Sequence, residues 1–140
     1  MWRGRGRGIV NIRIYGSSPF SAAVLHGGSG APGEMAPVAR ELAASMGVLE
    51  PMQTEASIKG QVRELQAALR DNGDIPLTLI GWSWGATLAF IFAARHPTFI
   101  KKLILIGSAP FEAKYAAGIT ATRLNRMDEE ARVEVLARRL

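Results

Sequence analysis

The sequence predicts one α/β domain in which a mostly parallel sheet is covered by helices on its faces. Short apolar runs alternate along the chain with segments of helical periodicity, which is the pattern of such a sheet. The 140 residues suffice for one domain with a real core but hardly for two. A hydrophobic fraction of 48% and a charged fraction of 21% are ordinary for a globular domain.

Five segments of the chain are expected to be strands. Residues 9–15 alternate apolar and polar side chains, which indicates an edge strand. Residues 20–27 are more apolar and lead directly into a glycine-rich loop, whereas a short strand over 48–52 is weakened by its proline. Residues 77–80 and 103–107 are apolar throughout, which predicts two buried strands.

Helices are expected between and after these strands. Residues 33–46 and 57–70 each place apolar side chains on one stripe, and the second stretch ends at an Asn-Gly pair. A very apolar helix over about 86–95 lacks a polar face, which predicts burial on most sides, and Pro97 stops it. Residues 128–140 carry acids in the first turn and arginines in the last, which suits a helix dipole. The side chains expected to face inward on the first two helices are Met35, Val38, Ala39, Leu42, Ala43, Met46, Ile58, Val62, Leu65 and Leu69.

Composition excludes several classes of site. The chain has no cysteine, which excludes a disulfide, a thiolate nucleophile and a Cys-based zinc site, and two histidines leave little for a metal centre. We therefore expect no metal and no cofactor. No apolar stretch approaches the ~20 residues of a membrane-spanning helix, so no membrane partner is expected. No secretory leader is recognisable, so the default compartment is the cytoplasm.

The net charge of +5 is concentrated in an RGRGRG start. Residues 1–8 are expected to form a basic, disordered arm. Nucleic-acid binding through this arm is the least favoured function, because no aromatic stacking platform or basic helix accompanies it.

The strongest chemical motif is Gly81-x-Ser83-x-Gly85, which stands between an apolar strand and an apolar helix. This is the pattern of a nucleophile elbow, a sharp turn in which the serine backbone is strained and its hydroxyl projects above the strand ends. The small glycines let strand and helix approach each other. A helix that begins just after Ser83 directs free N–H groups at any oxyanion formed there.

A second motif, His26-Gly27-Gly28-Ser29-Gly30, follows an earlier strand. Its glycines let the backbone approach a bound carbonyl and donate N–H groups to it. The alternative, a phosphate-binding loop, is disfavoured because the G-x-G-x-x-G spacing and a Lys-Ser/Thr pair are both missing. The loop and the elbow therefore stand in the order that acyl-transfer chemistry needs.

With these motifs the chain resembles the α/β-hydrolase superfamily, from about residue 9 to about residue 110. The HGGSG loop, the GWSWG elbow, the RHP helix end and the LILIG strand follow the family's order. The details are most similar to the proline-iminopeptidase, esterase and C–C hydrolase branch. A serine at the elbow argues against the haloalkane dehalogenase and epoxide hydrolase branches, which place an aspartate there.

The resemblance implies an α/β-hydrolase-type sheet and a role for each motif residue. Ser83 would be the nucleophile, and the N–H groups of Trp84 and Gly28 would form the oxyanion hole. His26 would shape the oxyanion loop and would not act as the catalytic base. The remaining residues that the resemblance assigns are Gly27 and Ser29 in the oxyanion loop, and Gly81, Trp82 and Gly85 in the nucleophile elbow. Trp82 either lines an acyl or aromatic substrate pocket or packs the elbow.

The sequence departs from this family after the elbow. The family's triad runs Ser, then acid, then His. His96 is the one histidine after Ser83, and it lies at the far end of a helix ~18 Å long. Asp128 is the one aspartate after Ser83, and it stands at a helix start, where capping is the default role. We therefore expect the triad acid and base to lie outside this chain. The sheet would then be truncated after about the strand that follows the nucleophile helix, although a shorter protein that works without the triad is an alternative.

The expected organisation is a basic arm over 1–8, the N-terminal part of a hydrolase core over 9–110, and the start of a helical lid over 111–140. The expected function is hydrolysis of a small-molecule ester, amide or related acyl substrate through an acyl-enzyme, with the chain alone inactive or only residually active. The alternative is a non-catalytic hydrolase-fold fragment or binding module. Self-association through an exposed sheet edge is expected as well.

Overall fold

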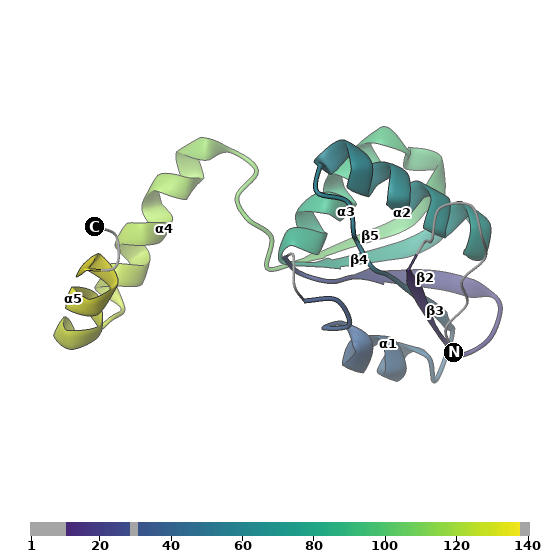
Figure 1. The fold of residues 1–140 in the computed structure, drawn as a ribbon, viewed down its shortest axis with the longest axis horizontal. Coiled ribbons are helices and arrows are strands. Elements are labelled where there is room, and N and C mark those ends of the chain that lie inside the picture. The colour runs from purple at the N-terminus through teal and green to yellow at the C-terminus, as the bar shows by residue number, and fades with distance from the viewer. Residues whose placement is uncertain (1–10, 29–30, 138–140) are drawn as a thin grey trace. The chain divides into compact units, whose positions relative to one another are not determined.

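The computed structural model describes residues 11–28 and 31–137, which form two compact units divided between Ala109 and Pro110. The first unit contains a five-stranded sheet with helices α1, α2 and α3, and the second contains helices α4 and α5 (Figure 1). The predicted arm over 1–8 and the loop residue Ser29 lie outside the described residues.

The sheet has the strand order β1-β3-β2-β4-β5. Its strands are β1 (Ile12–Tyr15), β2 (Phe20–Leu25), β3 (Gly47–Pro51), β4 (Leu77–Trp82) and β5 (Ile100–Ile106). β1 runs antiparallel to β3, and the other neighbouring pairs are parallel, so the prediction of a mostly parallel sheet is confirmed. Leu25 of β2 pairs with Gly81 of β4. The two motifs that follow these strands therefore start from adjacent positions at the same edge of the sheet.

Helices cover both faces of the sheet (Figure 1). Helix α1 (Ala36–Leu42) lies on one face, and α2 (Ile58–Asn72) and α3 (Trp84–Arg95) lie on the other. On the α2 and α3 side the buried cluster consists of Ile12, Ala23, Leu25, Leu49, Val62, Leu65, Ala68, Leu69, Leu77, Leu79, Leu88, Ala89 and Phe92. On the α1 side a smaller cluster consists of Ala22, Val24, Met35, Ala39, Val48 and Ile80. The larger core therefore lies beneath the helix that begins at the elbow.

Helix α1 is shorter than the predicted helix over 33–46. Gly33 has a φ of +89°, and the N–H of Ala36 donates to its carbonyl oxygen at 3.1 Å, so the chain makes a turn before the helix starts. A proline stands in the first turn of the helix. It is tolerated there because the N–H groups of a first turn have no acceptor within the helix. The prediction that Val38, Met46 and Ile58 face inward is wrong, because these residues are 39%, 37% and 44% exposed.

The burial of β3 and β5 differs from what the sequence predicted for these two strands. The weakly predicted β3 is fully buried between β1 and β2, and Pro51 occupies its last position, where the following N–H of Met52 donates to Asn11. The predicted buried strand over 103–107 is instead β5, the edge of the described sheet. Its Ile104 and Ile106 are 37% and 41% exposed, because no described element of the first unit covers the face of β5 on which they lie.

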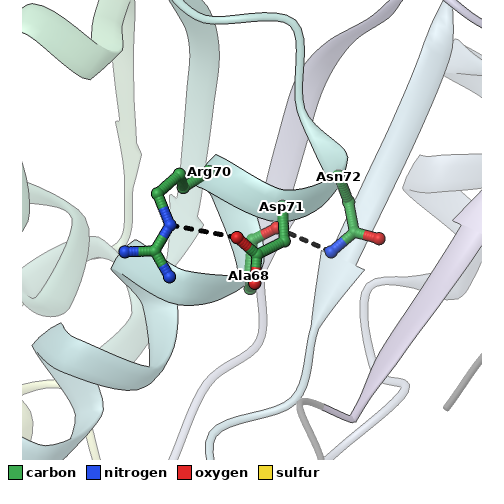
Figure 2. A network of polar contacts seen from close by, with 4 residues as sticks. All are labelled: Ala68, Arg70, Asp71 and Asn72. Atoms are coloured by element: carbon green, nitrogen blue, oxygen red, sulfur yellow. Dashed lines mark hydrogen bonds and ion pairs between the residues drawn. The ribbon is translucent and has the colours of Figure 1, made fainter. Parts of the chain in front are cut away.

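The end of α2 is closed by local polar contacts (Figure 2). Asn72 Nδ2 donates to the carbonyl oxygen of Ala68 at 2.9 Å, and Arg70 Nε lies 3.0 Å from Asp71 Oδ1. A Cβ at Gly73 would lie 2.8 Å from the carbonyl oxygen of Leu69. Glycine at this position therefore avoids a steric clash where the chain leaves α2 and continues toward β4. The helix ends at the Asn-Gly pair, as predicted.

A buried carboxylate lies beneath the α1 face. Glu50 of β3 is fully buried, and the hydroxyl of Tyr15 donates to its Oε2 at 2.6 Å. Burial raises the pKa of Tyr15, and the hydrogen bond to Glu50 raises it further. This contact between β1 and β3 gives the Glu50 carboxylate a hydrogen-bond donor, and a carboxylate buried without any donor would be costly.

The second unit is a helical pair formed by α4 (Ala113–Asn125) and α5 (Glu129–Ala137). Asp128 caps α5 as expected, since its Oδ1 accepts the N–H of Ala131 at 2.9 Å. Arg132 joins the two helices by donating from Nε and Nη2 to the carbonyl oxygen of Leu124, at 3.2 and 3.0 Å. Along the described residues no helix combines the length and apolar character that crossing a membrane requires.

We propose that the exposed edge and face of β5 cause the chain to self-associate. A variant with Ile104→Lys and Ile106→Lys should form fewer oligomers at equal concentration, because lysines on an edge strand disfavour pairing with another chain. Light scattering after size exclusion measures the mass. The matched control is Ile58→Lys, which changes an equally exposed isoleucine on α2. A monomeric parent chain, or equal association of the double variant, would contradict the proposal.

Candidate active site

Ser83 occupies a strained turn between β4 and α3. Its φ is +54° and its ψ is −116°, and no other non-glycine residue in the described part of the chain has a positive φ. Such a backbone costs about 1–3 kcal/mol and persists where the surroundings enforce it. The predicted strained strand-to-helix turn is confirmed. Helix α3 starts at Trp84, directly after the serine, and not at about residue 86.

The two elbow glycines stand where no side chain fits. A Cβ at Gly81 would lie 2.3 Å from the carbonyl oxygen of Gly85, inside the turn itself. A Cβ at Gly85 would lie 2.4 Å from the carbonyl oxygen of His26 and 2.5 Å from that of Leu25. At Gly85 the first turn of α3 therefore approaches the end of β2 so closely that only backbone fits between them. This contact fixes the start of the glycine-rich loop beside the elbow.

The glycine-rich loop borders the serine. A Cβ at Gly27 would lie 3.5 Å from Ser83 Cβ and 3.4 Å from Trp82 Cδ1. The next residue, Gly28, is exposed, and a Cβ there would meet no described atom within 4 Å. Trp84 opens α3, and the first N–H groups of a helix have no acceptor within it. The described residues of the two predicted motifs thus lie side by side at Ser83.

His26 is a buried side chain whose hydrogen bonds link the glycine-rich loop to the segment after β3. Its side chain is only 2% exposed, its Nδ1 lies 3.0 Å from the carbonyl oxygen of Gly27, and its Nε2 lies 3.2 Å from the backbone nitrogen of Gln53. The Gln53 N–H can only donate, so Nε2 accepts and Nδ1 carries the proton that it donates to Gly27. Because both ring nitrogens are engaged by backbone, neither is free to accept the Ser83 proton in this conformation.

The other titratable candidates lie elsewhere. His96 caps the opposite end of the 12-residue α3, about 18 Å along the helix axis from Ser83. Its ring packs 4.9 Å from that of Phe92, and Gln66 Nε2 lies 3.4 Å from its Nδ1. Asp128 caps α5 in the second unit. The described residues therefore assemble no catalytic triad, and none of them forms a cluster of three or more potential metal ligands.

The two tryptophans beside Ser83 have different surroundings. Trp82 is 39% exposed, and its ring lies over Gly107, where a Cβ would be 3.2 Å from Trp82 Cζ3. Trp84 Nε1 donates to Gln61 Oε1 at 2.9 Å, which ties α3 to α2. Trp82 thus packs against Gly107 and keeps part of its surface exposed to solvent.

Sequence reasoning missed one side chain at this site. The N–H of Gly27 donates to Glu34 Oε2 at 3.1 Å. Helical periodicity places Glu34 inside a helix and suggests no role for it, because nothing in its spacing from the loop distinguishes it from a solvated surface carboxylate. The turns that precede α1 bring it back to the loop.

A sequence model of the alpha/beta hydrolase fold matches residues 15–138. The chain belongs to the α/β-hydrolase fold family. This α/β-hydrolase is similar to the thioesterase domain from the curacin biosynthetic pathway, with 26% identity, a TM-score of 0.67, and coverage of 86% of this chain and 51% of that chain. It is also similar to VinJ, with 20% identity, a TM-score of 0.81, and coverage of 98% and 53%.

A third similar structure is the 2-hydroxy-6-oxo-6-phenylhexa-2,4-dienoate hydrolase from Rhodococcus sp. strain RHA1. It shares 20% identity at a TM-score of 0.62, over 74% of this chain and 44% of that chain. No curated protein matches the chain significantly. The α/β-hydrolase chain therefore spans about half the length of the solved structures that it matches.

In this α/β-hydrolase, Gly85→Ala should disrupt the packing of the elbow turn and destabilise the fold. The new methyl group would overlap the backbone of β2, and such overpacking costs about 1–3 kcal/mol or more of unfolding free energy. Urea denaturation measures the loss. The matched control is Gly28→Ala in the adjoining loop, where the methyl group meets no described atom and stability should change by less than about 0.5 kcal/mol. Equal stabilities of the two variants would show that backbone contact does not hold the elbow.

His26→Ala should lower the unfolding free energy by about 1–3 kcal/mol, because it leaves the Gln53 N–H and the Gly27 carbonyl without a partner. The same denaturation measurement applies. His96→Ala serves as a control, since it removes a partly exposed ring with one long polar contact, and we expect a smaller loss. A larger loss of unfolding free energy for His96→Ala than for His26→Ala would contradict the role of His26 in linking the loop to the segment after β3.

Proposed function

We propose that this chain supplies the nucleophile and the oxyanion hole of a serine hydrolase acting on ester, amide or related acyl substrates. One observation carries the proposal. Ser83 alone among the described non-glycine residues adopts a positive φ, at a strand-to-helix turn where its Cβ borders the Gly27 loop. A serine held in this way projects its hydroxyl toward backbone donors, which is the arrangement that acyl transfer uses.

In the proposed mechanism Ser83 Oγ forms a bond to the acyl carbon of the substrate. The carbonyl electron pair moves to oxygen, and the N–H groups of Trp84 and Gly28 donate to the oxyanion. Collapse of this intermediate breaks the bond to the alcohol or amine, which leaves with a proton, and Ser83 remains acylated. Attack by water on the acyl group then releases the acid and restores the serine.

A base must accept the Ser83 proton in this mechanism. The nitrogens of His26 are engaged by backbone groups, and His96 caps the far end of α3. We therefore include in the proposal that a histidine and an acid from outside these 140 residues complete the triad. The half-length coverage of similar structures supports this view. A reading frame that continues past codon 140 and encodes both residues would agree with it.

The acyl class of substrate rests on the serine and on what similar proteins are called. An elbow serine forms an acyl-enzyme, whereas an elbow aspartate suits ring opening or dehalogenation. A thioesterase domain and a marine microorganism esterase are among the similar structures, and both names describe acyl chemistry of those proteins. The lining of the acyl pocket would include Trp82, whose indole is partly exposed beside the elbow.

Acetylation by p-nitrophenyl acetate tests the proposal. The 140-residue chain should release p-nitrophenolate and gain an acetyl group on Ser83, located by mass spectrometry. The rate should lie far below the ~10 s⁻¹ of a median enzyme, because an oxyanion hole without a triad retains only about 10³-fold catalysis over water. A longer product of the same frame that carries the histidine should react orders of magnitude faster.

Two variants separate the outcomes. Ser83→Ala should abolish the acetylation, whereas Ser45→Ala, at an exposed position beyond α1, should leave it unchanged. Acetylation that persists in Ser83→Ala would refute the proposed nucleophile. Binding of the ester without acetylation of any serine, in both the short and the longer product, would favour the non-catalytic binding module.

A further inference from the structure

The carboxylate of Glu34 contacts the loop that the proposed mechanism uses. Its Oε2 accepts the N–H of Gly27 at 3.1 Å. A Cβ at Gly27 would lie 2.9 Å from this oxygen and 3.5 Å from Ser83 Cβ, so the carboxylate and the serine approach the same glycine. None of the roles assigned so far uses this side chain.

The backbone around Glu34 is held in place although the side chain is exposed. The N–H of Ala31 donates to the Gly28 carbonyl at 3.2 Å, and the N–H of Glu34 donates to the Ala31 carbonyl at 3.1 Å. Met35, the next residue, is 4% exposed and belongs to the core beneath α1. Glu34 is therefore anchored on both sides, by the loop itself and by the core.

We propose that Glu34 is a positioning residue for the oxyanion hole, an inference that rests on the proposed function. By accepting the Gly27 N–H, its carboxylate removes that donor from the space above Ser83. It also fixes the His26–Gly27 peptide plane, while the His26 ring, bonded to the Gly27 carbonyl oxygen, holds the next plane, so that the Gly28 N–H is the loop's donor to the oxyanion. Without this bond the loop could present either glycine N–H, and the donor would no longer be preorganised.

The charge of Glu34 acts against this benefit. A negative charge beside a developing oxyanion repels it, although solvent screens the repulsion because the side chain is exposed. The useful property of Glu34 is therefore its acceptor oxygen and not its charge. A glutamine at this position keeps an acceptor oxygen and lacks the charge, so it separates the two effects.

The test compares Glu34→Ala with Glu34→Gln in the 140-residue chain. The rate of Ser83 acetylation by p-nitrophenyl acetate should fall about tenfold or more in Glu34→Ala, since loss of one whole oxyanion donor costs about 10²–10³-fold. Glu34→Gln should retain the parent rate or exceed it. Glu41→Ala, which removes an exposed carboxylate from α1, is the matched control and should not change the rate.

Hydrogen exchange of the Gly27 amide gives a readout that does not depend on activity. This amide should be protected in the parent chain and in Glu34→Gln, and should exchange faster in Glu34→Ala. A parent-like rate in Glu34→Ala, or a Glu34→Gln variant as slow as Glu34→Ala, would overturn the proposal. If the exchange pattern holds but acetylation does not depend on Ser83, the contact stands and the proposed function fails instead.

Discussion

The contact on which the rest of the site depends is made by backbone against backbone. Helix α3 packs its first turn onto the ends of β2 and β4, and it can do so only because Gly81 and Gly85 carry no side chain. Ser83, which lies between these two glycines, has a positive φ, and the loop after β2 lies beside it. The strained serine and the glycine-rich loop are thus two consequences of a single packing constraint.

Magnitudes show how the strain at Ser83 is sustained. An unfavourable φ costs about 1–3 kcal/mol, while burial of one large apolar side chain contributes about 1.5–3 kcal/mol. Leu79 of β4 and Leu88 of α3 are both fully buried in the core on either side of the turn. Two such side chains are enough to offset the strain. The conformation of the serine therefore depends on the apolar residues of the strand and helix that flank it.

How much of the site the sequence reveals depends on whether a feature is local. The elbow and the loop are predictable, because each is a short motif with a steric requirement that strand and helix context sharpens. Strand order is not, and an apolar run such as β5 gives no sign of whether a neighbour covers it. Periodicity also extends α1 backward across Gly33, whose φ of +89° belongs to a turn. That turn brings Glu34 to the loop, so the same error conceals the contact.

In the mechanism that we propose, the described residues stabilise charge and do not transfer protons. The proposed donors are backbone N–H groups at the start of α3 and in the loop, and these cannot exchange a proton with substrate. The one imidazole near Ser83 among the described residues, that of His26, is buried and bonded through both nitrogens to Gly27 and Gln53. These two hydrogen bonds hold the loop in place, and a preorganised loop would serve the oxyanion stabilisation that we propose. The mechanism that we propose therefore takes its base for Ser83 from outside these 140 residues, since both nitrogens of His26 are engaged and His96 caps the far end of α3.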